Sequence, residues 1–347
     1  MSRAARRGEM LDPLAMEIGI ATFGDVSRDV TPAERIKQML KEAKLADEVG
    51  LDLYAVGEHH RPDYMISAPT VLLAAVAAQT ERIRLSSAVT VLSSEDPVRV
   101  WQQFAELDLI SGGRAEIMAG RGSFTESFPL FGYDLKDYEP LFAEKLDLLL
   151  KLQDGGPIDW RGEHRPSLQA DGIFPRPVQS PLPIWIAVGG TPASIERAAR
   201  LRLPLALAII GGRVSNFVGH VNLYRSAGGE GSPLAIQMHG FVAENATQAN
   251  SRFAPEQIEL MNRIGRERGW RPMTNQQYLA MTEGDGAIVV GSPEDVAEKI
   301  IGAHRLLGNS RFLMQMGVGS ISHEHVMESI ELLGTKVAPL VRAELAG

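Results

Sequence analysis

The sequence contains no cysteine, which excludes disulfide bonds, thiol nucleophiles, iron–sulfur clusters and zinc sites that depend on cysteine ligands. It also lacks long apolar runs. Its apolar runs, such as those at residues 184–188 and 203–210, are far shorter than the ~20 residues that a membrane-spanning helix needs. Residues 1–14 carry three arginines but no extended apolar core, so they do not resemble a secretory signal. We therefore expect a cytoplasmic protein with no membrane association.

Basic residues are in the minority. The 347 residues include 35 lysines and arginines against 43 aspartates and glutamates, a formal net charge of −8. This balance disfavours nucleic acid and anionic membranes as partners. Lysine itself is scarce, and none of the eight lysines ends a predicted strand. Schiff-base aldolases and pyridoxal-phosphate enzymes built on barrels need a lysine there, so both classes are disfavoured.

What the sequence does contain is a regular alternation of short apolar runs and longer helical patterns. The runs that predict strands are residues 16–22, 51–56, 83–91, 114–119, 184–188, 204–210, 234–242 and 311–317. Apolar strands that alternate with helices indicate a parallel sheet covered by helices. Eight such units close a (β/α)8 barrel, which is the predicted fold. A doubly wound open sheet is the alternative.

We expect one domain over residues 16–340, preceded by an N-terminal tail at residues 1–15. Insertions should follow the fourth and seventh strands. The Pro- and Gly-rich residues 154–183 predict irregular chain with one short hairpin, and residues 244–290 predict extra helices that form a candidate lid. Met314 and Met316 alternate along the last strand and are expected to line the barrel. Residues 111–114 (Ser-Gly-Gly-Arg) predict a turn that ends a helix.

Two strand ends favour a ligand that carries phosphate. The fifth strand ends in Gly189, Gly190 and Thr191, just before a helix, and unpaired N–H groups at a helix start attract anions. The alternative is a tight turn that needs glycine for its own sake. The fourth strand ends in Gly120, Arg121 and Gly122, and a guanidinium suits phosphate. The alternative here is a surface arginine paired with Glu126 or Asp134.

Two adjacent histidines, His59 and His60, follow the second strand. Side chains alternate in extended chain, so one of them is expected to face the barrel mouth, where it can act as a general base. The alternative is that both are satisfied polar groups in a loop. No other strand end offers a set of histidines and carboxylates, so no metal site is predicted.

Several short motifs occur in a fixed order along the chain. They are Gly57-Glu58-His59-His60, Ala88-Val89-Thr90-Val91-Leu92, Asp96-Pro97-Val98-Arg99, residues 107–114 (LDLISGGR), Gly120-Arg121-Gly122, residues 175–179 (PRPVQ) ahead of 183–187 (PIWIA), and residues 290–294 (VGSPE). Their order and spacing over residues 16–339 resemble the bacterial luciferase-like family of flavin-dependent oxidoreductases.

The resemblance implies a homodimeric (β/α)8 barrel that binds FMN at its carboxyl face, or the deazaflavin F420 in some relatives. It implies that His59 is the catalytic acid/base, oriented by Glu58 or a backbone group. It also implies a non-prolyl cis peptide at Ala88-Val89 against the flavin ring. The residues implied to bind the cofactor are Thr22, Phe23, Ala88, Val89 and Thr90 at the ring, and Gly120, Arg121, Gly122, Gly189, Gly190, Thr191 and Ser194 at the phosphate.

By this resemblance the protein is an FMN-dependent monooxygenase that oxygenates a small organic substrate with O2 through a flavin C4a-peroxide. A separate NAD(P)H flavin reductase would supply the reduced FMN. Two alternatives stay open: an F420-dependent oxidoreductase that transfers hydride, and a flavin-binding protein without turnover. The sequence departs from luciferase at Gly189 and Gly190, which replace an acidic residue, and at Val89, which replaces a smaller one.

Overall fold

The structure is a computed structural model that describes residues 16–27 and 29–346, so the predicted tail at residues 1–15 lies outside the described residues. Eight parallel strands form a ring, which closes where β9 pairs with β10. In order around the ring they are β1 (Glu17–Thr22), β2 (Leu53–Val56), β3 (Arg84–Ser87), β5 (Ala115–Gly120), β8 (Ile184–Val188), β9 (Leu205–Ile209), β10 (Leu234–Val242) and β12 (Arg311–Gln315). The predicted barrel is confirmed, and the open sheet is wrong.

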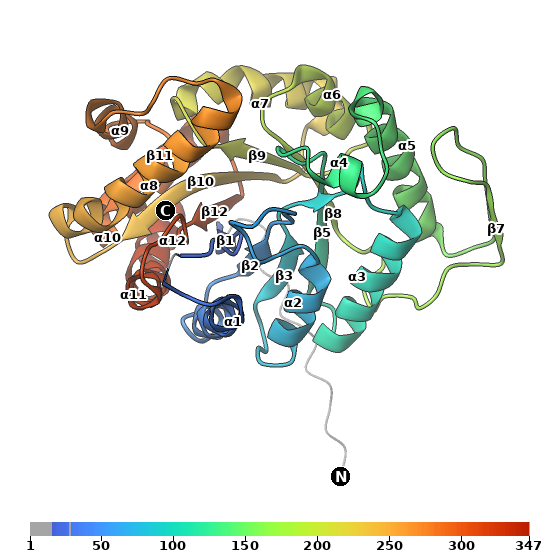
Figure 1. The fold of residues 1–347 in the computed structure, drawn as a ribbon, viewed down its shortest axis with the longest axis horizontal. Coiled ribbons are helices and arrows are strands. Elements are labelled where there is room, and N and C mark those ends of the chain that lie inside the picture. The colour runs from blue at the N-terminus through green and yellow to red at the C-terminus, as the bar shows by residue number, and fades with distance from the viewer. Residues whose placement is uncertain (1–15, 28, 347) are drawn as a thin grey trace, which may run out of the picture.

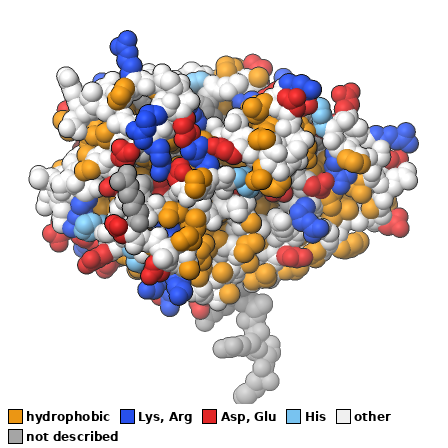
Figure 2. All heavy atoms as spheres, viewed as in Figure 1, with side chains coloured by type: hydrophobic (Ala, Val, Ile, Leu, Met, Phe, Trp, Pro, Cys, Tyr) orange, Lys and Arg blue, Asp and Glu red, His pale blue; other side chains and the backbone are white. Residues whose placement is uncertain are grey.

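Helices surround the strands (Figure 1). They are α1 (Pro32–Glu48), α2 (Pro69–Ala77), α3 (Pro97–Ser111), α4 (Ser127–Leu130), α5 (Tyr138–Lys151), α6 (Pro192–Arg200), α7 (Val218–Tyr224), α8 (Ala246–Arg268), α9 (Asn275–Thr282), α10 (Pro293–Leu307), α11 (His323–Leu332) and α12 (Ala338–Leu345). None of them is long and apolar enough to cross a membrane. Acidic and basic side chains are interspersed on the face shown in Figure 2.

Local sequence signals set several helix boundaries. Thr31 and Glu34 form a reciprocal capping box at the start of α1, where Pro32 occupies the first turn. The Asp96 side chain caps α3 by accepting from the N–H groups of Val98 and Arg99. Gly112 ends α3 with a φ of 69°, a left-handed conformation that glycine adopts without strain. The predicted turn at residues 111–114 is therefore confirmed.

Both predicted insertions are present. After β5, a two-stranded antiparallel hairpin of β6 (Ile158–Trp160) and β7 (Leu168–Ala170) projects from the edge of the barrel at the right of Figure 1. After β10, the chain adds α8 and α9 and then β11 (Ile288–Gly291). The sequence did not predict β11, which pairs with the second half of β10. Residues 90–91 form β4, a two-residue strand paired with the end of β5.

The barrel interior contradicts one prediction. Met314 and Met316 belong to the large cluster between the strands and the helices, so they do not line the barrel. Leu313, which alternates with them, lies in the inner cluster, and Gln315 lines the cavity above it. Side chains do alternate along β12, but the set that faces the barrel interior is the other one. This barrel places polar side chains on the inward face of β12.

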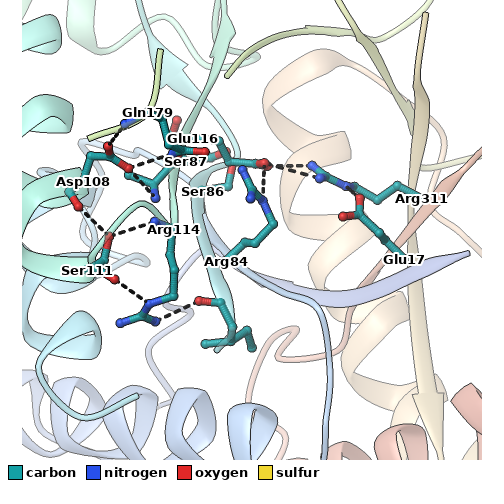
Figure 3. Close-up of polar contacts among 12 residues, drawn as sticks. Glu17, Arg84, Ser86, Ser87, Asp108, Ser111, Arg114, Glu116, Gln179 and Arg311 are labelled. Atoms are coloured by element: carbon teal, nitrogen blue, oxygen red, sulfur yellow. Dashed lines mark hydrogen bonds and ion pairs between the residues drawn. The ribbon is translucent and has the colours of Figure 1, made fainter. Parts of the chain in front are cut away.

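A buried ion cluster fills the amino-terminal end of the barrel (Figure 3). Arg311 donates to Glu116 and to Glu17, each at 2.6 Å, and Arg84 donates to Glu116 at 3.1 Å. Glu116 is 1% exposed. Burial alone would raise its pKa, but the guanidiniums of Arg311 and Arg84 outweigh that effect and hold the pKa below its usual value.

The motif at residues 107–114 has a structural role on the same side of the barrel (Figure 3). The Arg114 guanidinium donates to the carbonyl oxygens of Ala77, Thr80 and Ile83 at 2.9–3.0 Å. These bonds tie the chain between α2 and β3 to the start of β5. Asp108 accepts from the Gln179 side chain at 2.7 Å, which joins α3 to the segment before β8.

Candidate functional site

One cavity of about 580 Å³ opens at the carboxyl ends of the strands, a size typical of sites for cofactors and small molecules. Ten of the predicted site residues line it: Phe23, Glu58, His59, Ala88, Val89, Gly120, Arg121, Gly122, Gly189 and Thr191. Four others do not: Thr22, Thr90, Gly190 and Ser194. The Thr22 hydroxyl instead accepts from the Gly24 N–H at 3.1 Å, which fixes the turn after β1.

The two predicted phosphate-binding strand ends meet. Arg121, directly after β5, donates from Nη2 to the Thr191 hydroxyl at 3.2 Å, and Thr191 is the N-cap residue of α6. Arg121 also pairs with Glu139, which bonds Arg197 of α6 as well. Neither alternative partner of Arg121 is used, since Glu126 pairs elsewhere and Asp134 pairs with Lys136. The sequence did not predict that Glu139 would bridge these two arginines.

The polar groups at this end fit a phosphate. Three buried atoms at or beside α6 have no hydrogen-bond partner within residues 16–27 and 29–346: Ser194 Oγ, Arg197 Nη1 and His220 Nδ1. The His220 ring faces Gly190, whose φ of 121° is in the range that favours glycine. Buried donors without partners are rare in folded proteins, so their concentration beside Arg121 indicates a ligand with several acceptor oxygens.

A backbone wall borders the cavity beside β3. The Ala88–Val89 peptide bond is cis, as the family resemblance implied. Gly120 of β5 faces this wall closely, because a Cβ at Gly120 would lie 2.8 Å from a Val89 methyl carbon. Glycine at this position lets the two strand ends approach, and the wall presents few side-chain atoms to a flat ligand.

His59 lies in an aromatic pocket at the edge of the cavity. Its ring stacks on Tyr64 with centroids 4.4 Å apart and meets Phe23 edge-on at 4.6 Å. The residue is 8% exposed. Burial, reinforced by the positive charge of Arg61, lowers the pKa of His59 to about 3. The imidazole is therefore neutral at neutral pH, with a lone pair on one ring nitrogen.

The predicted link between Glu58 and His59 is wrong. One Glu58 oxygen lies 2.9 Å from His60 Nε2, and the other accepts from the Val91 N–H at 2.9 Å. Side chains two residues apart in extended chain share a side, so Glu58 and His60 face each other and His59 points away. Glu58 thus fixes His60 and the chain after the cis peptide.

This buried histidine predicts a pH effect on stability. The unfolded chain binds a proton at His59 near pH 6.5, whereas the folded chain keeps it neutral down to about pH 3. His59 therefore makes the free energy of unfolding decrease as pH falls below about 6.5. Urea unfolding should show that His59→Phe gains about 2 kcal/mol relative to wild type between pH 6.5 and 5. An equal response of both proteins to pH would show that His59 is protonated in the fold.

The helix α8 forms the outer wall of the cavity. Its residues Leu260, Met261, Ile264 and Arg268 line the cavity, as does Trp270 beyond its end. The Arg268 side chain donates to the Ser123 carbonyl at 2.8 Å, which holds the helix against the loop after β5. The predicted lid segment therefore covers the site, while its opening and closing stay a prediction.

Three polar side chains that the sequence did not predict as site residues, Gln237, His239 and Gln315, form the floor of the cavity. A signal was present, because Gln237 and His239 occupy alternate positions in an otherwise apolar strand. Two polar residues at spacing two mark one face of a strand. On a strand buried on both faces, that face points to a polar cavity or ligand.

Comparison with known proteins gives the family. Residues 16–310 match luciferase-like monooxygenases. The Sinorhizobium fredii protein y4wF is 34% identical over 169 residues, about half of each chain (48% and 49%). The 4-hydroxyprotoasukamycin monooxygenase of Streptomyces nodosus subsp. asukaensis is 26% identical over 330 residues, 89% of this chain and 87% of that one. An F420-dependent glucose-6-phosphate dehydrogenase of Amycolatopsis mediterranei is 30% identical over 162 residues, 44% of this chain and 48% of that one.

Solved structures share the fold. Monooxygenase RslO1 from Streptomyces bottropensis superposes with a TM-score of 0.82 at 24% identity, over 93% of this chain and 99% of that one. The oxygenating constituent of 3,6-diketocamphane monooxygenase from Pseudomonas putida, in complex with FMN, gives 0.76 at 21% identity, over 94% and 98%. The F420-dependent tetrahydromethanopterin reductase of Methanopyrus kandleri gives 0.71 at 17% identity, over 94% and 99%. With the family match over most of its length and this shared barrel, the chain belongs to the luciferase-like monooxygenase family.

Proposed function

We propose that this protein is an FMN-dependent monooxygenase that uses reduced FMN and O2 to oxygenate a small organic substrate. One observation carries the proposal: Arg121 and Thr191, from two neighbouring strand ends, bond each other at one end of the cavity. A phosphate placed there would meet the guanidinium, the hydroxyl and the N-terminus of α6 together. The 3,6-diketocamphane monooxygenase component that shares the fold and was solved with FMN, and a monooxygenase relative that matches nearly the whole chain, support it.

Bound reduced FMN would supply the electrons that activate O2. The protein's own residues position the flavin and exclude water. Arg121 and Thr191 would bind the phosphate, and the Ala88–Val89 backbone would support the ring. The apolar side chains of α8 cover the cavity, and such exclusion of water protects reactive species from hydrolysis. A ring nitrogen of neutral His59 would accept a proton from the substrate.

Arg121→Ala tests the phosphate assignment. We expect FMN to bind about 10- to 150-fold more weakly, because one or two charge-assisted hydrogen bonds worth ~1.5–3 kcal/mol are lost. Fluorescence titration of FMN measures the change.

Riboflavin is the matched control ligand, because it lacks the phosphate and should bind both proteins equally. Arg200→Ala removes a charge from α6 at a side chain that is 67% exposed, and it should leave FMN affinity unchanged. Equal FMN affinity of Arg121→Ala and wild type would contradict the assignment.

F420-dependent hydride transfer is a second candidate. It is favoured by the F420-dependent dehydrogenase relative, which is 30% identical over part of the chain. The phosphate end would also accept the phosphodiester of F420, since Arg121 presents the same donors to either group. Two assays separate the candidates: under argon, bleaching or recovery of F420 absorbance with a substrate supports the dehydrogenase, whereas in air, formation of an oxygenated product from the substrate with reduced FMN supports the monooxygenase.

Two partners are part of the proposal. We expect a separate NAD(P)H flavin reductase to supply reduced FMN, and two copies of the chain to form a homodimer, as the family resemblance implies. Mass photometry of the purified protein measures the second expectation directly.

A further inference from the structure

Three polar side chains stand on the cavity floor, from the middle of β10 and the last residue of β12. Gln237 and His239 belong to β10 and Gln315 to β12, and they are 8%, 3% and 1% exposed. The other strand residues that line the cavity are apolar or glycine. Apolar side chains would fill these positions without the cost of burying polar groups. The three polar residues therefore need an explanation outside packing.

The floor keeps hydrogen-bonding capacity to spare. Gln237 Nε2 donates to Gln315 Oε1 at 2.9 Å, a bond that uses one group of each amide. It leaves the Gln237 oxygen as an acceptor and the Gln315 nitrogen as a donor. His239 Nδ1 lies 2.8 Å from Gln257 Oε1 of α8, and Gln315 is a second hydrogen-bond partner of the ring, so the imidazole is held beside the two amides.

The floor is also uncharged. Burial lowers the pKa of His239 to about 4, partly offset by Gln257 and Gln315, so its imidazole is neutral at neutral pH. The charged side chains that line the cavity have partners elsewhere: Glu58 bonds His60, Arg121 bonds Glu139, Glu126 bonds Arg61, and Arg268 bonds the Ser123 carbonyl. None of them comes from β10 or β12.

The ring of strands separates this floor from the Ala88–Val89 wall. β10 is four strands from β3 in either direction, so Gln237 and His239 lie across the barrel from the Ala88–Val89 wall. Small residues make room beside the amides, because Ala208 pairs in register with Gln237 and Ala21 with Gln315. A flavin against the wall would leave this space for a second molecule.

We propose that Gln237, His239 and Gln315 form the subsite for the polar head of the substrate, and that this head is an uncharged carbonyl, hydroxyl or amide group on an otherwise apolar molecule. The inference rests on the proposed function in calling that molecule the substrate. A carboxylate or sulfonate here would lack a cation, and an ammonium would lack a carboxylate, so burying either would be costly.

Four probes of similar size test the charge preference: 1-cyclohexylethanone, cyclohexanecarboxamide, cyclohexanecarboxylate and cyclohexylmethylammonium. Isothermal titration of the protein, with and without FMN, should give binding of the ketone and the amide at least about tenfold tighter than that of either ion. A charged probe that binds as tightly as the neutral ones overturns the proposal. So does failure of both neutral probes to bind at their solubility limits.

A negative charge introduced on the cavity floor should change the order of the probe affinities. Gln237→Glu keeps the shape of the side chain and adds a carboxylate. The affinity for the ammonium probe should therefore rise at least about tenfold relative to the affinity for the ketone. Gln276→Glu, on the exposed side of α9, is the matched control and should leave the order unchanged. Gln315→Glu repeats the test if Gln237→Glu does not fold. An unchanged order in the folded floor variant overturns the subsite.

These titrations also separate the two proposals. If the proposed function is wrong, the wild-type protein will neither bind FMN nor oxygenate a substrate with it, whichever probes bind. If only the subsite is wrong, the protein will bind FMN normally but will not bind the neutral probes more tightly than the charged ones.

Discussion

Turnover should fall by ~10²–10⁴-fold when His59 is replaced by alanine, while FMN affinity stays nearly unchanged. The ring lines the cavity, and its nitrogens make no side-chain hydrogen bond among the described residues. Because the pKa of His59 is about 3, the base form is present throughout the ordinary pH range. Formation of oxygenated product from a substrate with reduced FMN and O2 measures turnover, and fluorescence titration measures affinity.

His59→Phe is the matched variant, because phenylalanine keeps the stacking on Tyr64 but has no nitrogen. It should lose as much turnover as His59→Ala.

The wild-type rate should show no decline from His59 protonation between pH 8 and pH 5. Wild-type turnover in His59→Phe would remove the proton-transfer role and leave His59 as an aromatic wall.

Arg311→Met should lower the free energy of unfolding by about 3–5 kcal/mol, because it leaves the Glu116 carboxylate buried with only Arg84 beside it. Arg311 is 3% exposed and joins β12 to both β1 and β5. The change removes charge compensation at the point where these strands begin. Urea unfolding followed by circular dichroism measures the loss.

The double variant Arg311→Met/Glu116→Leu is the sharper control. It removes both charges of the central pair, so we expect it to be less destabilised than the sum of the two single variants. Arg200→Met, at a mostly exposed side chain of α6, should change stability by less than about 0.5 kcal/mol. A small effect of Arg311→Met would mean that water or Arg84 alone compensates Glu116.

Much of the fold was predictable because its signals are local. Each strand is a short apolar run, and each boundary has its own turn or cap, such as Thr31 at α1 and Gly112 at α3. The meeting of Arg121 and Thr191 was also predictable, since β5 and β8 are neighbours in a parallel ring and their carboxyl ends lie on one face. β11 was missed because four apolar residues before a helix cap carry no periodicity.

Two errors share one cause, the direction of side chains. Glu58 was one of the two groups expected to orient His59, although alternation turns it toward His60. Met314 was placed inside the barrel, although it packs between strands and helices and its neighbour Gln315 lines the cavity. Apolar periodicity cannot assign the inward face of a strand that is buried on both sides.

The sequence by itself determined the eight strands of the barrel and their order, the two insertions, and the strand ends that carry arginine, glycine and histidine. These follow from propensity, turn chemistry and spacing, which act over a few residues. Only the tertiary structure decided that Glu139 shares Arg121 with Thr191, that α8 walls the cavity, and that Gln237 and Gln315 meet on its floor. Each of these contacts joins residues far apart in the chain, and its geometry exists only once the ring has closed.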